Sequence, residues 1–217
     1  MIALAIDAAR GGFSAAVAQD DRIIAAQSLP GNQALEHGLE ALAQTMNDAG
    51  ITPQQLDRLG VGIGPGSFTG VRIAISYAKS LAQAWQLPLA GVTTFDALEF
   101  GARVQGDALG VVRGRTGVVS VRLRRAGGEV IRASGYIHDA LAELGNGPGA
   151  LQLFGDAEDV LAGLAERGFT VTAISNSIEP TAAAIALAAL QREPARSAHE
   201  VRADYGELPA VTRKTAL

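Results

Sequence analysis

The sequence predicts an α/β protein made of two lobes in tandem, each with the element order β-β-β-α-β-α. Two patterns carry this prediction. Apolar residues alternate with period two in short segments separated by tight turns, and the period then lengthens to that of a helix. This change occurs twice, so we expect a first lobe over residues 1–103, a second over 104–194 and a tail over 195–217 without a clear period. A length of 217 residues with 48% hydrophobic content suits a globular protein of this size.

The first three strands are expected to form an antiparallel meander. Apolar residues alternate with alanines over Ile2–Ile6. Phe13–Ala18 and Arg22–Leu29 follow across tight turns at Gly11-Gly12 and Asp20-Asp21. Short strands joined by such turns pair with their neighbours in the chain.

The first helix is predicted from one apolar stripe of helical spacing, which ends at Gly50 as a C-cap. The stripe consists of Leu35, Leu39, Leu42 and Met46. The rest of the lobe is expected to contain a turn or two opened by Thr52-Pro53, a strand over Leu59–Ile63, a helix over Val71–Trp85, a strand over Leu87–Val92 and a helix from Thr93 or Thr94 to about Arg103.

The second lobe repeats this order without repeating the sequence. Its expected strands are Ala108–Arg113, Gly117–Arg124, Glu129–Ala133, Leu151–Phe154 and Phe169–Ala173. Its expected helices are His138–Leu144, Ala157–Arg167 and Thr181–Gln191. Two such units in tandem are the plan of the superfamily that contains actin, hexokinase and Hsp70, so we expect this actin-like fold, with the break near Gly101–Asp107.

Composition narrows the classes of function. With no cysteine, the chain has neither disulfides nor thiolate metal sites. It has no apolar run of about 18 uncharged residues, the length that crosses a membrane, and Met1–Asp7 suits a first strand better than a signal peptide. We therefore expect a cytoplasmic protein.

One segment is rich in arginine although the net charge is −4. The arginines at issue are Arg113, Arg115, Arg122, Arg124 and Arg125. They would attract a nucleic-acid backbone or an acidic partner. The alternative, a solvated edge hairpin whose charge prevents sheet association, is favoured because no aromatic residues interleave to stack bases.

A glycine-rich loop joins the strand that ends near Ile63 to the following helix. Its candidate anion-binding residues are Gly64, Gly66, Ser67 and Thr69. So many glycines indicate that the backbone approaches something closely: a phosphate, a partner chain or the neighbouring lobe. The loop lacks the Gly-Lys-Ser/Thr of a Walker loop and the Gly-x-Ser-x-Gly of a nucleophile elbow, so Ser67 and Thr69 are expected to cap the helix.

Asp7 ends the first strand, at the position where actin-like proteins grip nucleotide phosphates. The next residues are Ala8, Ala9 and Arg10, where a phosphate-binding turn offers glycine and hydroxyl groups. We therefore expect a degenerate turn with no tightly bound nucleotide, in which Asp7 accepts hydrogen bonds from local amides. The histidines His37, His138 and His199 are scattered, and Ala41 stands one helical turn after His37, so no metal site is expected.

The two long helices of the first lobe carry apolar or small residues on more than one face. Such helices either bind a partner or pack within the lobe. The candidate interface residues are Leu35, Gly38, Leu39, Leu42, Val71, Arg72, Ile75, Ala78 and Ala82.

The run Gly-Pro-Gly-Ser-Phe-Thr-Gly-Val-Arg over Gly64–Arg72 resembles the signature of the bacterial TsaB (YeaZ) family. Asp7, His37 and Leu87–Thr94 fit the same family. The second half departs from it, because Val112–Val119 lacks the aspartate and glutamate that the family usually has there.

This resemblance implies a catalytically silent relative of TsaD, the enzyme that transfers threonylcarbamoyl to adenosine 37 of certain tRNAs. TsaD-like proteins carry a His-x-x-x-His metal pair, of which this chain keeps His37 only. The implied partners are a TsaD-like transferase, a TsaE-like ATPase and a second copy of the chain. Contact with tRNA would be indirect or through the Arg113–Arg125 region, and ATP or ADP would bind weakly, within the complex only.

Three hypotheses of function follow from these observations. The first is a non-catalytic scaffold that activates a TsaD-like enzyme. The alternative is an actin-fold nucleotide-binding enzyme, either an ATPase or a small-molecule kinase. The third, a peptidase, lacks both a nucleophile–base pair and metal ligands in the sequence.

Overall fold

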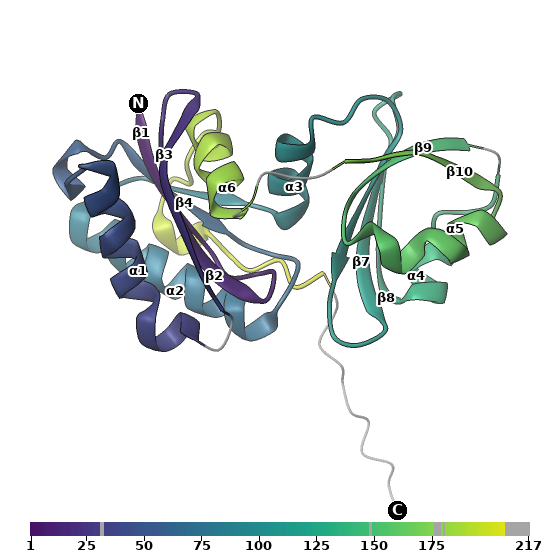
Figure 1. Ribbon diagram of the computed structural model, residues 1–217, viewed down its shortest axis with the longest axis horizontal. Coiled ribbons are helices and arrows are strands. Elements are labelled where there is room, and N and C mark those ends of the chain that lie inside the picture. The colour runs from purple at the N-terminus through teal and green to yellow at the C-terminus, as the bar shows by residue number, and fades with distance from the viewer. Residues whose placement is uncertain (31–32, 148, 176–178, 180, 207–217) are drawn as a thin grey trace, which may run out of the picture.

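The computed structural model describes residues 1–30, 33–147, 149–175, 179 and 181–206. Figure 1 shows two lobes side by side, each built on its own sheet. Both sheets have five strands, in the orders β3-β2-β1-β4-β5 and β10-β9-β6-β7-β8. This arrangement agrees with the two lobes expected from the alternation of strand and helix patterns.

The first sheet joins an antiparallel meander to two parallel strands. The meander consists of β1 (Ile2–Asp7), β2 (Gly12–Gln19) and β3 (Arg22–Pro30), and the parallel strands are β4 (Arg58–Gly62) and β5 (Leu89–Val92). Ile6 of β1 pairs with Ala15 of β2 and with Val61 of β4. As a result β1 lies in the middle of the sheet, and both β1 and β4 end at the same edge.

Helices cover both faces of this sheet (Figure 1). They are α1 (Ala34–Ala49), α2 (Phe68–Trp85), α3 (Thr94–Ala102) and α6 (Thr181–Leu190), with 3-10 turns η2 (Pro53–Gln55) and η4 (Ala198–Glu200). Helices α1 and α2 pack on one face around Leu4, Phe13 and Val61. Helix α6 packs on the other face, and α3 lies between the lobes.

The core-facing side of α1 differs from the predicted stripe. Leu42 and Met46 are buried as expected, but the side chains of Leu35 and Leu39 are 68% and 51% exposed. Gly38 faces the core in their place, because a Cβ there would lie 3.0 Å from the Tyr77 ring and 3.2 Å from the Phe13 ring. These two rings fill the space that the stripe assigned to leucines.

The second sheet carries helices α4 and α5 on one face. Its strands are β6 (Ala108–Arg113), β7 (Val118–Arg124), β8 (Val130–Tyr136), β9 (Gly149–Gly155) and β10 (Phe169–Ser175). Its helical elements are α4 (Ile137–Ala142), the 3-10 turn η3 (Ala157–Val160) and α5 (Leu161–Glu166). Leu109, Val121, Leu141 and Leu153 form the centre of this core.

Helix α6 belongs to a different lobe from the one expected. The predicted second lobe extended to residue 194, but α6 packs on β1, β2 and β4 of the first sheet and on α3. Small residues allow this close approach: a Cβ on Gly60 would lie 3.0 Å from the Cβ of Ala189. The chain therefore returns from the second lobe to the first.

Residues 195–206 also lie on the first lobe, although no period predicted their course. The amide of Ala195 donates to the carbonyl of Leu89 at 3.0 Å, and that of Asp204 to the carbonyl of Ile63 at 2.7 Å. Val201 is buried in the first core. Residues 207–217 of the expected tail lie outside the described part of the chain.

No helix in the part of the chain that the structure describes is both long and apolar enough to span a bilayer.

Candidate functional site

Asp7 lies at the end of β1, in a cavity of about 290 Å³ at the carboxyl edge of the first sheet. Its side chain is 3% exposed, and Oδ1 accepts a hydrogen bond from the amide of Ala9 at 3.2 Å. Burial raises the pKa of Asp7 to about 6, against the opposing effects of the Ala9 amide and the Arg10 charge. As expected, the Asp7 carboxylate accepts a hydrogen bond from a local amide, and the structure adds that it is buried.

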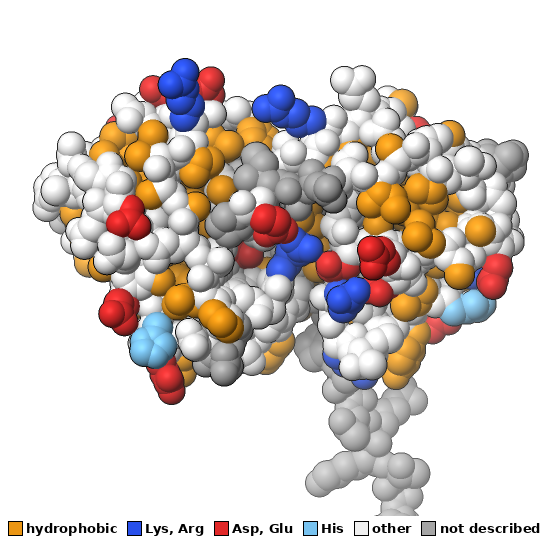
Figure 2. Space-filling model, viewed as in Figure 1, with side chains coloured by type: hydrophobic (Ala, Val, Ile, Leu, Met, Phe, Trp, Pro, Cys, Tyr) orange, Lys and Arg blue, Asp and Glu red, His pale blue; other side chains and the backbone are white. Residues whose placement is uncertain are grey.

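Arg10 places a cation beside Asp7 and joins the two lobes. Its Nη2 donates to Oδ1 of Asp156, which follows β9 in the second lobe, at 3.1 Å, and its Nη1 pairs with Glu179. Figure 2 shows charged side chains of both signs where the lobes meet. The protein's own guanidinium thus lies at the strand edge where the superfamily is expected to hold nucleotide phosphates, and it is neutralised by carboxylates from the chain.

The glycine loop approaches the turn after β1 in its own lobe, a neighbour that was not among the three we expected. The amide of Ser67 donates to the carbonyl of Ala9 at 2.7 Å. A Cβ on Gly66 would lie 2.2 Å from that same oxygen, and one on Gly70 would lie 1.9 Å from the carbonyl oxygen of Ala8. The close approach therefore takes place within the first lobe.

The loop also places the start of α2. Gly64 has a φ of 94°, and a Cβ there would lie 2.2 Å from the carbonyl oxygen of Asp204. Ser67 caps α2 as predicted, since its Oγ accepts the amide of Gly70 at 3.2 Å. Thr69 is not the cap; it lies exposed on the first turn of the helix.

Most of the predicted interface residues face the protein's own core. Six are buried in the first lobe: Gly38, Leu42, Val71, Ile75, Ala78 and Ala82. Helices α1 and α2 both pack against the sheet, so their small and branched residues lie in the core between helix and sheet. Only Leu35, Leu39 and Arg72 of the predicted set are exposed.

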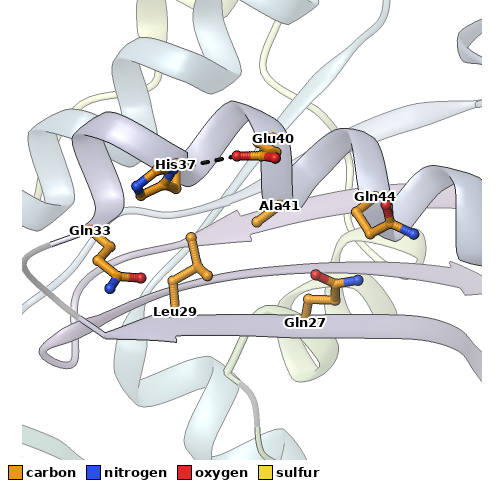
Figure 3. A pocket seen from close by; sticks show the side chains of 7 residues that line it. All are labelled: Gln27, Leu29, Gln33, His37, Glu40, Ala41 and Gln44. Carbon is orange, nitrogen blue, oxygen red and sulfur yellow. Dashed lines mark hydrogen bonds and ion pairs between the residues drawn. The ribbon is translucent and has the colours of Figure 1, made fainter.

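A polar groove of about 360 Å³ runs between α1 and the edge strand β3 (Figure 3). His37 lies in it, with Nδ1 3.3 Å from Oε2 of Glu40. Gln27, Gln33 and Gln44 add amide groups to the lining. Ala41 lines the groove too, and the described residues contain no cluster of three or more groups suited to hold a metal.

The arginine-rich segment is largely neutralised by the protein's own carboxylates. Arg113 binds both oxygens of Asp159, at 2.7 and 2.9 Å. Buried Arg122 pairs with Asp96 and Glu99 of α3. The remaining pairs join Arg124 to Glu99 and Arg125 to Asp107. Of the five arginines, only Arg115 lacks an ion pair among the described residues, and it lies over the Tyr136 ring at 5.5 Å.

A third cavity, of about 620 Å³, lies between α2 and residues 199–205. Sequence reasoning missed it, because residues 195–217 show no period and were expected as a tail. The only available signal was Arg72, which was predicted as a candidate interface residue.

Comparison with known families and sequences adds to this geometry. Residues 32–201 match the family model "TsaD: tRNA N6-adenosine threonylcarbamoyltransferase". The chain is 33% identical over 105 residues to the tRNA threonylcarbamoyladenosine biosynthesis protein TsaB of Bacillus subtilis, covering 48% of this chain and 45% of that protein. It is 35% identical over 99 residues to the TsaB of Escherichia coli, covering 46% and 43%. The chain thus matches less than half the length of these relatives.

Solved structures resemble most of the chain. The protein described as YeaZ from Pseudomonas aeruginosa aligns with a TM-score of 0.64 at 22% identity, covering 94% of this chain and 99% of that one. Another Pseudomonas aeruginosa protein, described as similar to peptidase YeaZ, aligns with a TM-score of 0.70 at 22% identity, covering 95% and 99%. A ROK hexokinase from Thermus thermophilus aligns with a TM-score of 0.51 at 15% identity, covering 88% and 98%. These likenesses confirm the actin-like two-lobed fold.

Proposed function

The chain belongs to the TsaD family and, within it, to the TsaB (YeaZ) family, and we propose from this that it takes part in making threonylcarbamoyladenosine in tRNA. Its role would be that of a non-catalytic subunit that binds and activates a TsaD-like transferase. On this proposal it works in the cytoplasm with a TsaE-like ATPase, self-associates when free and contacts tRNA through its partner.

The position of Arg10 supports the proposal that the chain is not itself a catalyst. A nucleotide-using actin-like enzyme presents amides and hydroxyls to phosphate at the turn after its first strand. Here the guanidinium of Arg10 lies in that cavity and pairs with Asp156 and Glu179. A nucleotide would have to displace both carboxylates, so we expect ATP or ADP to bind in this cavity weakly, within the complex only.

Exposed leucines on α1 support a docking surface. Leu35 and Leu39 are four residues apart, so they lie on one side of the helix. Both are more than half exposed, although burying a leucine contributes about 1.5–3 kcal/mol. A partner helix packed here would recover that free energy.

Activation would work by a shift of conformational population. If the chain binds the active conformation of the transferase more tightly than the inactive one, complex formation raises the active fraction. This needs no chemistry in the chain itself, which agrees with a cavity whose lining includes the ion-paired Arg10.

The competing function is an actin-fold ATPase or small-molecule kinase. Buried Asp7 beside a cavity of about 290 Å³ is the observation that favours it. That reading requires nucleotide binding by the free chain that is lost in Asp7→Ala. Calorimetry on the free chain that detects no heat at millimolar ATP would eliminate it.

Size-exclusion chromatography with light scattering tests the docking proposal. The chain is run alone and mixed with the TsaD-like protein of the same organism, as wild type, as Leu39→Glu and as the control Val130→Glu. Val130 is also about half exposed but lies on β8 of the second lobe. We expect a heterodimer with the wild type and the control, and none with Leu39→Glu at unchanged circular dichroism.

Two results would contradict the proposal at different levels. Normal heterodimers formed by both Leu39→Glu and Leu35→Glu would remove the α1 surface from the interface. No complex with the wild type, even with nucleotide and the TsaE-like ATPase present, would remove the function itself.

A further inference from the structure

We propose that the cavity between α2 and residues 199–205 binds a nucleoside phosphate, with its phosphate among basic side chains and its base on an exposed aromatic ring. We call this cavity, of about 620 Å³, the basic pocket. Its polar lining consists of Arg72, Ser76, Lys79, His199, Arg202 and Tyr205.

The charges of the basic pocket are uncompensated. Arg72, Lys79 and Arg202 make no ion pair among the described residues, and no carboxylate lines the pocket. By contrast, Arg10 and Arg122 are each held by two carboxylates. Cations gathered around a concave site repel each other and attract an anion, so the site favours an oxyanion ligand.

Two elements supply these groups from opposite sides. Arg72, Ser76 and Lys79 follow at helical spacing along one side of α2. Arg202 and His199 come from the segment after α6, whose 3-10 turn η4 packs against α2. Glu200 and Asp204 belong to the same segment but do not line the pocket, and Asp204 Oδ1 accepts the amide of Gly206. Guanidinium, ammonium and hydroxyl groups together are typical of phosphate recognition.

An aromatic platform adjoins the cations. The Arg72 guanidinium carbon lies 3.7 Å from the Phe68 ring centroid, and its Nε donates to the Tyr205 hydroxyl at 2.9 Å. The two ring centroids are 4.9 Å apart, and the Phe68 side chain is 52% exposed. A nucleotide base can stack on such a ring. An acidic peptide or inorganic phosphate has no base and would make no use of the ring. The platform therefore favours a nucleoside phosphate.

This pocket differs from the site first expected for RNA. The Arg113–Arg125 region pairs four of its five arginines internally. The basic pocket instead combines unpaired cations with the Tyr205 ring, which contacts Phe68 beside the pocket. The inference goes beyond the proposed function, in which tRNA contact is indirect, and it does not depend on Leu35 and Leu39.

A nucleoside phosphate can come from two sources, a free nucleotide or an unpaired stretch of RNA. Fluorescence anisotropy on the chain alone, with a labelled single-stranded RNA of about ten nucleotides, tests the second source. Calorimetry with AMP and ATP tests the first. Arg72→Ala, Lys79→Ala and Phe68→Ala are compared with the wild type, and Arg115→Ala is the control, since Arg115 is exposed and lies outside the pocket.

We expect Arg72→Ala to weaken binding about tenfold, because a hydrogen bond to a charged group is lost. For RNA it should also reduce the salt dependence of log K by about 0.7 for each phosphate contact removed. Phe68→Ala should weaken binding about tenfold without changing the salt dependence, since stacking is uncharged. Arg115→Ala should bind as the wild type does.

Binding of RNA alone identifies RNA as the source, and binding of AMP or ATP identifies the free nucleotide. No binding of any probe at low salt overturns the inference. Equal losses in Arg72→Ala and Arg115→Ala overturn it too, because they show a diffuse charge effect. If Arg72→Ala abolishes binding to the TsaD-like protein and leaves RNA and nucleotide binding unchanged, the pocket contacts an acidic protein surface instead. Because these probes are applied to the chain alone, their failure is separate from failure of the docking proposal.

Discussion

Replacing Gly70 with alanine tests whether the glycine loop is an internal contact. Gly70 lies in the first turn of α2, and its Cβ would be 1.9 Å from the carbonyl oxygen of Ala8 and 2.9 Å from its carbonyl carbon. Ordinary contact begins at 3.4 Å, so the turn would have to retreat by about 1.5 Å. Two contacts oppose that movement. The carbonyl of Ala9 accepts a hydrogen bond from the amide of Ser67, and Arg10 forms an ion pair with Asp156.

The magnitude follows from three terms. Overpacking of this kind costs about 1–3 kcal/mol, and loss of the Ser67–Ala9 hydrogen bond costs about 1 kcal/mol. Alanine returns about 1 kcal/mol through its higher helix propensity. We therefore expect Gly70→Ala to lower the free energy of unfolding by about 2 kcal/mol, which corresponds to a Tm about 4–8 °C lower for a chain of this length.

Urea denaturation followed by far-ultraviolet circular dichroism measures this change, with Gly127→Ala as control. A Cβ on Gly127 would meet no heavy atom within 4 Å, so that variant should stay within about 0.5 kcal/mol of the wild type. A Gly70→Ala protein as stable as the wild type would refute the reasoning, because the turn would then have room and the loop's glycines would need another cause.

Two further predictions concern buried charges. Asp7→Asn should remove a pH dependence of the free energy of unfolding. The pKa of Asp7 is about 6 in the folded chain and 3.8 in the unfolded chain. The wild type should therefore lose about 3 kcal/mol of stability relative to the variant as the pH rises from about 4 to above 6. Urea titrations that give parallel stability–pH curves for the two proteins would contradict this. Arg122→Met should cost about 2 kcal/mol, because the partly buried Asp96 and Glu99 lose their hydrogen bonds to the buried guanidinium and each keep one other arginine, Arg192 and Arg124. Arg132→Met is its control, since Arg132 pairs with Arg122 in register on β8 but is exposed; equal losses in the two variants would contradict the assignment.

Local patterns predicted the parts of the fold that depend on nearby residues. The meander of β1, β2 and β3 follows from alternation and tight turns, and the Ser67 cap follows from its place before α2. The glycines predicted a close backbone approach, and that approach exists. Its target, the turn at Ala8–Ala9, could not be predicted, since it lies more than 50 residues earlier in the chain.

The remaining features depend on contacts that no local pattern records. Helix α6 is apolar on nearly all sides, so its sequence does not specify which sheet it covers. On α1, either the side with Leu35 or the side with Gly38 could face the core, since both fit helical spacing. The Gly38 side does so because the rings of Phe13 and Tyr77 pack against it. The sequence predicted an exposed charge at Arg122, because its partner Asp96 lies 26 residues away in the chain.

Measuring threonylcarbamoyladenosine directly tests the central claim, that the chain supports this modification without catalysing it. Unmodified tRNA, the threonylcarbamoyl donor, the TsaD-like and TsaE-like proteins and this chain are combined, and the modified nucleoside is quantified by mass spectrometry. We predict that modification requires the chain, stays near the wild-type rate with Asp7→Asn and is lost with Leu39→Glu. If Asp7→Asn abolishes modification while the complex still forms, the chain contributes chemistry of its own and the claim is wrong.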